Sequence, residues 1–205
     1  MGDLTATPAD QKLRITVLRL AFVAVIPLIL FSRSAYLEPE WAYDLLEVAG
    51  IFLVILAVLG RFWSILYIGG HKNALVMQEG PYSICRHPLY LFSTLGVAGL
   101  GAMLGSFVLT ALLGGMTFLI LYVTARKEER FLLSEFGDAY RSYAARTPRI
   151  WPKLSLFHTR EEVVFNTQTL KGNFFDALVF LAFIPLVELL EWLKDASFIP
   201  TFMIY

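Results

Sequence analysis

Long apolar segments are the feature that most limits what this chain can fold into. A helix needs about 20 consecutive, mostly apolar residues to cross the hydrocarbon core of a bilayer. Five segments approach or exceed that length, at residues 15–31, 45–68, 89–105, 107–124 and 174–192. Hydrophobic residues make up 57% of the chain, above the roughly 45–50% of soluble domains. The sequence therefore predicts an all-α integral membrane protein with about five transmembrane helices.

The third and fourth apolar segments are separated by only a residue or two, which predicts a tight helical hairpin. Small residues let membrane helices approach closely. The hairpin carries them at Gly96, Gly99, Gly101, Gly105, Gly114 and Gly115. The fourth helix should continue without a break into an amphipathic helix over residues 126–145. The 205 residues should form one domain, with a core at 66–152 and a C-terminal extension at 153–205 that carries the last transmembrane helix.

Basic residues are distributed unevenly, which predicts the orientation in the membrane. Three basic residues flank the start of the first helix, the loop that follows it is acidic, and the segment 126–171 holds nine of the 17 lysines and arginines. Cytoplasmic loops carry the excess of basic residues. We therefore expect the N-terminus, the loop 69–88 and the segment 126–173 to share the cytoplasmic face. The formal net charge of zero argues against nucleic acid as a partner.

A dense cluster of polar and turn-forming residues, GPYSICRHPLY, fills positions 80–90 between the second and third apolar segments. Pro81 favours a turn or the first position of a short helix. Pro88 biases His87 out of the helical region and opens the third helix. The N-terminus of a helix attracts carboxylates and phosphates, and Arg86 and His87 would add donors at the same point.

A second polar cluster, Arg126-Lys127-Glu128-Glu129, follows the fourth apolar segment. On a helix Arg126 and Glu129 are three residues apart and therefore neighbours. Because both clusters are expected on the cytoplasmic face, we interpret them as one site. Cations would lie near one pole and carboxylates near the other, which suits a zwitterionic ligand.

Each of these residues also has a plainer interpretation when taken alone. His87 would serve as a helix cap, Arg86 as one more cytoplasmic charge, and the two glutamates as part of a solvated helical face. Cys85 is the only cysteine, so an intrachain disulfide is excluded, and a small apolar filler is favoured over a reactive thiol. The functional interpretation depends on the joint occurrence of the two clusters.

The two clusters belong to longer strings that resemble a known superfamily. LVMQEGPYSICRHPLY at 75–90 and EERFLLSEFGDAYRSYAARTPRIWP at 128–152 are similar to the isoprenylcysteine carboxyl methyltransferase and phospholipid methyltransferase superfamily. The first block matches at Gly80, Pro81, Tyr82, Arg86, His87, Pro88 and Tyr90, and the second at Glu128, Glu129, Leu132, Phe136, Gly137 and Tyr140. Both blocks lie within residues 66–152, so the first two helices and the C-terminal extension fall outside the resemblance.

The resemblance implies S-adenosylmethionine as a methyl donor bound by both blocks at the cytoplasmic face of a membrane, expected to be the bacterial inner membrane. The cofactor-binding residues it implies are Val76, Gly80, Pro81, Tyr82, Arg86, His87, Tyr90, Glu128 and Glu129. The catalytic candidates it implies are Arg126, Glu129 and Tyr90. His87 would hold the methionyl carboxylate, and Arg126 would orient the acceptor. No metal site is predicted.

The acceptor is not specified by any residue. A lipophilic molecule with an isoprenylcysteine-like carboxylate is favoured, and a phospholipid amine or a small thiol are the alternatives. A membrane reductase that uses NADPH is a further alternative, although it should need more cations around the 2′-phosphate. A noncatalytic membrane scaffold would leave the paired clusters without an explanation. Membrane lipids are expected partners, and the oligomeric state stays open.

Overall fold

A computed structural model describes residues 11–35, 40–69, 75–163, 165 and 167–205 of the chain. The elements are α1 (Gln11–Phe31), β1 (Ser32–Ser34), α2 (Glu40–Ile68), α3 (Pro81–Ile84), α4 (Pro88–Met103), α5 (Phe107–Arg146), the 3-10 helix η2 (Leu154–Leu156), α6 (Thr167–Asp195) and β2 (Phe202–Ile204). The first ten residues and residues 70–74 of the loop 69–88, both of which entered the predicted orientation, lie outside the described residues.

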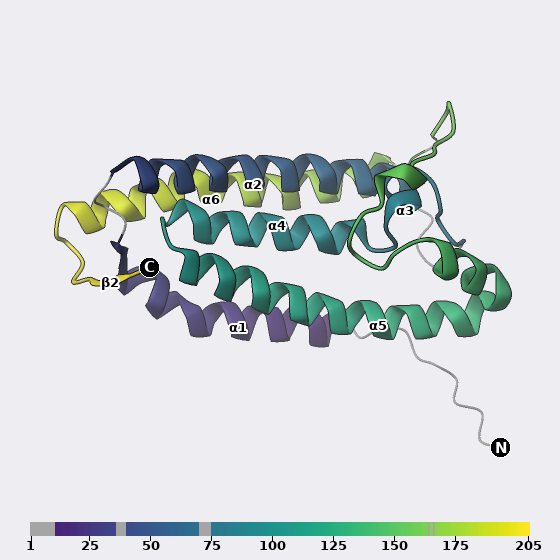
Figure 1. Cartoon of the computed structure of the whole chain (residues 1–205), viewed down its shortest axis with the longest axis horizontal. Coiled ribbons are helices and arrows are strands. Elements are labelled where there is room, and N and C mark those ends of the chain that lie inside the picture. Colours follow the sequence, from purple (N-terminus) through teal and green to yellow (C-terminus); the bar gives the residue numbers. More distant parts are fainter. Residues whose placement is uncertain (1–10, 36–39, 70–74, 164, 166) are drawn as a thin grey trace, which may run out of the picture.

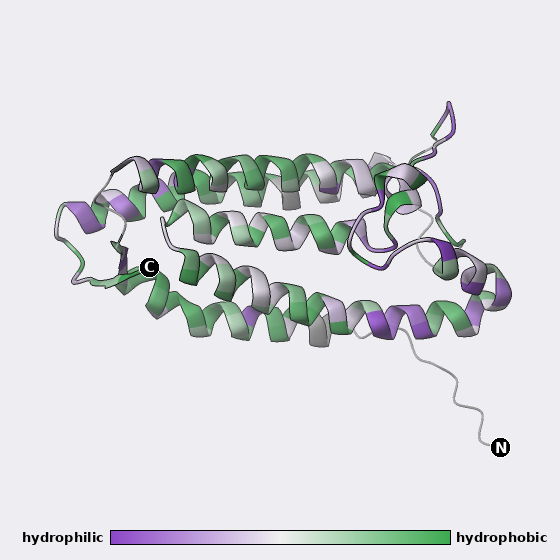
Figure 2. Cartoon of the chain, in the orientation of Figure 1, coloured by the Kyte–Doolittle hydropathy of each residue, from purple (hydrophilic) through white to green (hydrophobic). Residues whose placement is uncertain are grey.

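The long helices form an elongated bundle in which α4 is central (Figure 1). α4 packs against α2 on one side and against α5 on the other, α6 lies along α2, and α1 lies along α5. The short helix α3 and the chain that follows α5 lie together at one end of the bundle, and β2 lies at the opposite end. Apolar residues dominate the helices, whereas polar residues gather in the far half of α5 and in the loops beside it (Figure 2).

The predicted hairpin is present, with α4 and α5 joined by three residues, 104–106. Its glycines serve two interfaces, because α4 is covered on two sides. A Cβ on Gly101 would lie 2.5 Å from the backbone nitrogen of Thr110 in α5, whereas one on Gly99 would lie 2.8 Å from the backbone oxygen of Gly50 in α2. Gly115 has no neighbour within 4 Å of its position, so it makes no such close approach.

Two described helices, α2 and α5, are long and apolar enough to cross a membrane, and the apolar parts of α1 and α4 are shorter. The count of five transmembrane helices stays a prediction. The fourth helix continues past residue 126 without a break, as predicted, but it is kinked within the segment 126–145 that was predicted to be one amphipathic helix. Gly137 has φ 52° and ψ −123°, so α5 is two helical segments joined at a kink. A positive φ is readily adopted only by glycine, which explains why the kink falls at this residue.

The C-terminal extension is part of the bundle. Phe180 of α6 lies against Gly96 of α4, and Val187 packs against the buried cluster of Val54, Leu100 and Met103. The extension ends in β2, which pairs in parallel with β1, Ser32 opposite Phe202. This strand pair corrects the all-α prediction in detail. The strand pair forms because residues 202–204 return to residues 32–34 after α1. No local sequence pattern predicts such a long-range contact.

Candidate active site

The first block folds as its proline positions predict. Gly80 caps α3 with φ 58°, and Pro81 takes the first helical position. A Cβ at Gly80 would lie 2.4 Å from the Tyr67 ring, so both the backbone angle and the available space require glycine there. His87 caps α4 in a non-helical conformation, with φ −127° and ψ 61°, and Pro88 opens the helix.

Side chains of the two sequence blocks meet at the N-terminus of α4. The His87 Nε2 atom lies 3.2 Å from Oε1 of Glu129, and the Tyr90 hydroxyl donates to Oε2 of Glu128 at 2.7 Å. The His87 and Tyr90 rings stack with centroids 5.2 Å apart and an interplanar angle of 4°. The structure therefore brings side chains of the two clusters into contact, and their role as one ligand-binding site stays a prediction.

Arg149 is the residue of this cluster that the sequence reasoning missed. Its Nε and Nη2 atoms donate to the Glu129 carboxylate at 2.9 and 2.7 Å, and its Nη1 atom donates to the Tyr122 hydroxyl at 2.9 Å. The guanidinium also lies over the Tyr122 ring, 5.2 Å from its centroid. The hydrogen bonds to Glu129 raise the pKa of Arg149, so it remains a cation. A basic residue set between two prolines in TPRIWP was the available signal.

The predicted separation of a cationic pole from a carboxylate pole is wrong for Glu129. Nη2 of Arg86 lies 3.3 Å from Oε1 of this carboxylate, which also contacts His87 and Arg149. Glu129 lies beyond the apolar part of α5, which ends near residue 124, and is only 8% exposed. Burial by itself would raise its pKa, but hydrogen bonds from His87 and Arg149 and the charge of Arg86 lower the pKa to about 2. Glu129 is thus an ionised anchor for the cationic side chains.

Arg126 lies outside the contacts that define this cluster. Its side chain is on the exposed side of α5, whereas Glu129, three residues later, is buried. Its carbonyl oxygen accepts a hydrogen bond from Nε of Arg130 at 3.4 Å. The predicted helical proximity to Glu129 therefore does not bring the Arg126 side chain into the cluster. The acceptor-orienting role of Arg126 stays a prediction.

Backbone hydrogen bonds bind the segment after α5 to the first block. They join Arg86 N to Pro148 O, His87 N to Arg149 O, Lys153 N to Ile84 O and Gly80 N to His158 O, at 2.9 to 3.0 Å. The Tyr143 hydroxyl of α5 adds a bond of 2.7 Å to the carbonyl oxygen of Tyr82. The position of Arg149 is thus fixed by the same turns that place His87.

Three buried polar atoms beside the cluster have no hydrogen-bond partner within the described part of the chain. These are the Tyr140 hydroxyl, the Tyr82 hydroxyl and Nε of Arg86. A buried polar group left unpaired costs about 1–3 kcal/mol. Such a cost is tolerated at sites where a ligand supplies the missing partner. Tyr82 and Arg86 were both predicted to bind the cofactor.

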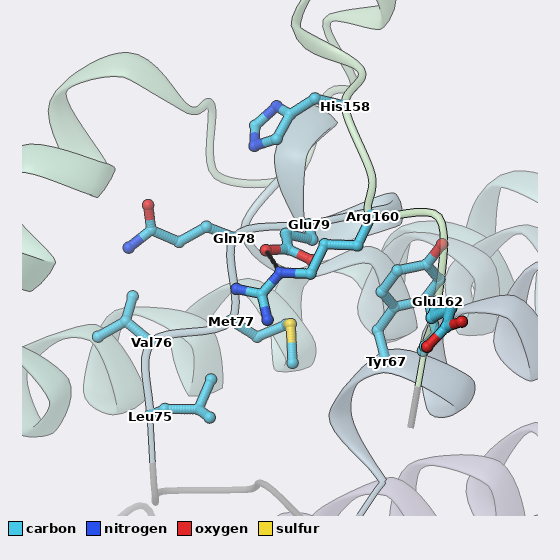
Figure 3. A pocket seen from close by; sticks show the side chains of 10 residues that line it. Tyr67, Leu75, Val76, Met77, Gln78, Glu79, His158, Arg160 and Glu162 are labelled. Carbon is cyan, nitrogen blue, oxygen red and sulfur yellow. Dashed lines mark ion pairs between the residues drawn. The ribbon is translucent and has the colours of Figure 1, made fainter. Parts of the chain in front are cut away.

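A cavity of about 410 Å³ lies beside the first block (Figure 3). Val76, predicted to bind the cofactor, lines it together with Tyr67, Leu75, Met77, Gln78, Glu79, His158, Arg160, Glu162 and Val163. Glu79 and Arg160 form an ion pair of 2.6 Å within this lining. Neither His87 nor Glu129 lines the cavity. Of the predicted cofactor residues, Val76 alone is in the lining of this cavity.

Cys85 should not react with thiol reagents in the folded protein. Its side chain is fully buried, and burial raises the pKa of the thiol to about 12, although a backbone hydrogen bond involving His87 acts in the opposite direction. The thiolate is the reactive form, and it is scarce at neutral pH under these conditions. A maleimide should label the protein at pH 7 only after denaturation in sodium dodecyl sulfate. Stoichiometric labelling of the folded protein would contradict this expectation.

The described residues contain no group of three or more His, Cys, Asp or Glu side chains placed to hold a metal ion.

Most of the segment that builds the site matches a known protein family, and Arg149 lies beyond the matched residues. Residues 45–139 match the family model described as phospholipid methyltransferase. Protein-S-isoprenylcysteine O-methyltransferase of Schizosaccharomyces pombe is 32% identical over 78 residues, which are 38% of this chain and 33% of that protein. No solved structure matches the chain.

Two bacterial proteins are similar over most of the chain. The cobalt-zinc-cadmium resistance protein CzcN of Cupriavidus metallidurans is 38% identical over 185 residues, which are 90% of this chain and 84% of that protein. The nickel-cobalt-cadmium resistance protein NccN of Alcaligenes xylosoxydans xylosoxydans is 34% identical over 182 residues, which are 89% of this chain and 85% of that protein. With the family match over residues 45–139, these similarities show that the chain belongs to the phospholipid methyltransferase family, whose members are membrane methyltransferases.

Proposed function

We propose that the protein transfers a methyl group from S-adenosylmethionine to a lipophilic acceptor at the cytoplasmic face of the membrane. The observation that carries the proposal is the contact of His87 and Tyr90 with Glu128 and Glu129 across some forty residues of chain. A folding role alone would not require two glutamates, of which Glu129 is buried, a histidine and two arginines in one place. Buried charges are costly, and they are retained where function needs them.

The residues present fit the proposed cofactor. The Tyr82 hydroxyl and the Arg86 guanidinium have donor atoms without partners in the described chain, which suits a carboxylate, and His87 caps a helix whose N-terminus attracts the same group. Val76 lines a cavity large enough for part of a nucleoside. Bound S-adenosylmethionine would supply a methyl group activated on a sulfonium. The protein's contribution would be to orient the ligands and to exclude water.

Within this proposal Glu129 and Arg149 are positioning residues. Glu129 holds the guanidiniums of Arg86 and Arg149 and the ring of His87 through hydrogen bonds and ion pairs. His87 and Arg86 would contact the ligand, and Glu128, hydrogen-bonded to Tyr90, would face its amine or ribose. The isoprenylcysteine-like carboxylate is the favoured acceptor, because the S. pombe relative is named for that activity. A phospholipid amine or a small thiol stays the alternative.

Ligand linkage tests the cofactor. A ligand that binds only the folded state raises the unfolding temperature as its concentration exceeds Kd. The purified protein in detergent should become more stable with S-adenosylmethionine or S-adenosylhomocysteine and not with NADPH. The His87→Ala variant should lose this stabilisation. Stabilisation by NADPH alone would overturn the methyltransferase proposal in favour of a reductase.

Isotope transfer tests the acceptor. Membranes that contain the protein would be incubated with methyl-labelled S-adenosylmethionine and a panel of prenylcysteines, phospholipids and small thiols. Mass spectrometry should find the label on a prenylcysteine-type carboxylate as a base-labile ester. Label on a lipid amine or a thiol would reassign the acceptor while keeping the reaction class. Absence of label on every acceptor would count against the proposal as a whole.

The names of CzcN and NccN suggest a cellular context. We propose that this chain also serves resistance to divalent heavy metals, and that it does so by methylating an acceptor. Cells that lack the gene should grow poorly with cobalt, zinc, cadmium or nickel, and the wild-type gene should restore growth. The Glu129→Gln variant should fail to restore it. Full rescue by that variant would separate resistance from methyl transfer.

A further inference from the structure

The segment 150–157, IWPKLSLF, exposes large apolar side chains next to the charged cluster. Trp151 is 72% exposed, Leu154 73% and Phe157 52%. Such exposure is unusual for a loop in water, where a contiguous apolar surface marks an interaction site. Lys153 lies in the middle of the segment and is also exposed. The pattern of aromatic and aliphatic residues around one lysine is typical of the membrane interface.

The path of this segment can be followed against α5. Arg149 reaches Tyr122, with a hydrogen bond of 2.9 Å, whereas Trp151 lies against Phe118, with ring centroids 6.2 Å apart. The chain therefore runs back along α5 toward its apolar N-terminal part as it leaves Arg149. The apolar part of α5 ends near residue 124. At 1.5 Å per residue, Phe118 lies roughly 9 Å inside that boundary.

Along α2 the segment runs in the opposite direction, toward the end of the bundle. Phe157 lies against Trp63, with centroids 6.0 Å apart, and Thr159 is hydrogen-bonded to Tyr67 at 2.8 Å. The chain thus moves toward the end of α2, at Ile68, as it leaves Phe157. The segment therefore runs toward the middle of the bundle along α5 and back toward its end along α2. The segment lies at the same end of the bundle as α3 (Figure 1).

We infer that residues 150–157 form a re-entrant loop that lies in the bilayer interface, with Trp151, Leu154 and Phe157 against lipid. Non-helical backbone is tolerated at membrane depth where its polar groups are paired within the protein. The loop meets that condition at several points. Lys153 N donates to the Ile84 carbonyl, and in the 3-10 helix Leu156 N and Phe157 N donate to carbonyls three residues earlier, each at 3.0 Å.

Lipid is the occupant that this surface fits. Trp151 contacts Phe118, and the neighbouring Leu119 and Val123 of α5 are 64% and 53% exposed. The apolar surface of the loop is therefore continuous with the exposed apolar face of a helix long enough to cross the membrane. The exposed ammonium of Lys153 can reach lipid phosphates from such a depth. The inference concerns the location of the loop and does not depend on the proposed reaction.

Tryptophan fluorescence in proteoliposomes tests the location of the loop. The chain has four tryptophans, and the variant Trp41→Phe, Trp63→Phe, Trp192→Phe keeps Trp151 as the emitter. Two references are made in a background where Trp151→Phe is added. Leu119→Trp reports the lipid-facing surface of α5, and Glu135→Trp reports its exposed charged part.

Brominated acyl chains should quench Trp151 to the extent seen for Leu119→Trp, and aqueous iodide should quench it far less than Glu135→Trp. Quenching by iodide without quenching by bromine would overturn the inference, and so would protection from both, which would mean burial by protein. Should the triple variant fail to fold, Leu154→Cys with a nitroxide label gives a second measurement, because Cys85 is buried. Greater collision with oxygen than with a water-soluble nickel complex is then expected.

Discussion

The Glu129→Gln variant should lose methyl transfer by about 100-fold or more, because two charge-assisted hydrogen bonds of about 1.5 kcal/mol each would be weakened. The amide keeps the shape of the side chain and removes its charge. Arg86, His87 and Arg149 would then lack the anion that now holds them within 2.7 to 3.3 Å. The rate with methyl-labelled S-adenosylmethionine measures the effect, and the stabilisation by S-adenosylhomocysteine should fall with it.

The matched control is Glu135→Gln, which makes the same change on an exposed position of α5. It should keep the rate and the unfolding temperature of the wild type, since isolated exposed charges contribute little. Removal of one partner from a buried ion pair costs about 3–5 kcal/mol, so Glu129→Gln should also lower the unfolding temperature. A Glu129→Gln enzyme with wild-type rate would show that the cluster is structural and that the active site lies elsewhere.

The parts of the site that local chemistry determines were predictable from the sequence. Pro88 has a fixed φ and restricts the conformation of the residue before it. The cap at His87 and the start of α4 could therefore be predicted from the pair His87-Pro88. The charge distribution predicts that both clusters lie on one face of the membrane, and this orientation stays a prediction. The short connection between the third and fourth apolar segments predicted the hairpin. The predicted connection was one or two residues shorter than the observed one.

Other parts of the site depend on contacts between residues that are far apart in the sequence, and no local sequence pattern predicts such contacts. Arg149 lies in a segment without helical or strand periodicity, and its pairing with Glu129 arises only when the chain after α5 turns back to α3. The pairing of charges replaced the predicted separation of poles, since burial strongly favours direct contact of opposite charges. The kink falls at Gly137, which was in the matched pattern, but a single glycine within a helical pattern does not show by itself that the helix bends there.

These observations change the role that Glu129 can have. A carboxylate that already contacts two guanidinium groups and the His87 ring has little capacity left for a ligand amine, whereas Glu128 lies beside it with the Tyr90 hydroxyl as a partner. The ligand would instead meet the donor atoms of Arg86 and Tyr82 that the protein does not pair. The charged cluster would then act as a rigid base beneath the cofactor, and Arg149 would connect that base to the loop 150–157.

The Arg149→Lys variant should lose methyl transfer by about tenfold, and Arg149→Met by about 100-fold, because lysine keeps the charge but cannot reproduce the parallel hydrogen bonds of a guanidinium. Those bonds join Nε and Nη2 to the two oxygens of Glu129 at 2.9 and 2.7 Å. Arg141→Lys is the matched control. Arg141 is 70% exposed and pairs with Asp138 on the surface, so its replacement should leave the rate unchanged.

A double variant distinguishes a positioning role for Glu129 from direct contact with the cofactor. Residues that act as one unit have strongly non-additive effects. If Glu129 serves to hold Arg149 and its neighbours, Glu129→Gln combined with Arg149→Met should be little slower than either single variant. If Glu129 contacts the ligand independently, the two losses should multiply to about 10⁴-fold. The multiplied loss would restore the bipartite arrangement predicted from the sequence, with Glu129 as a ligand-facing carboxylate.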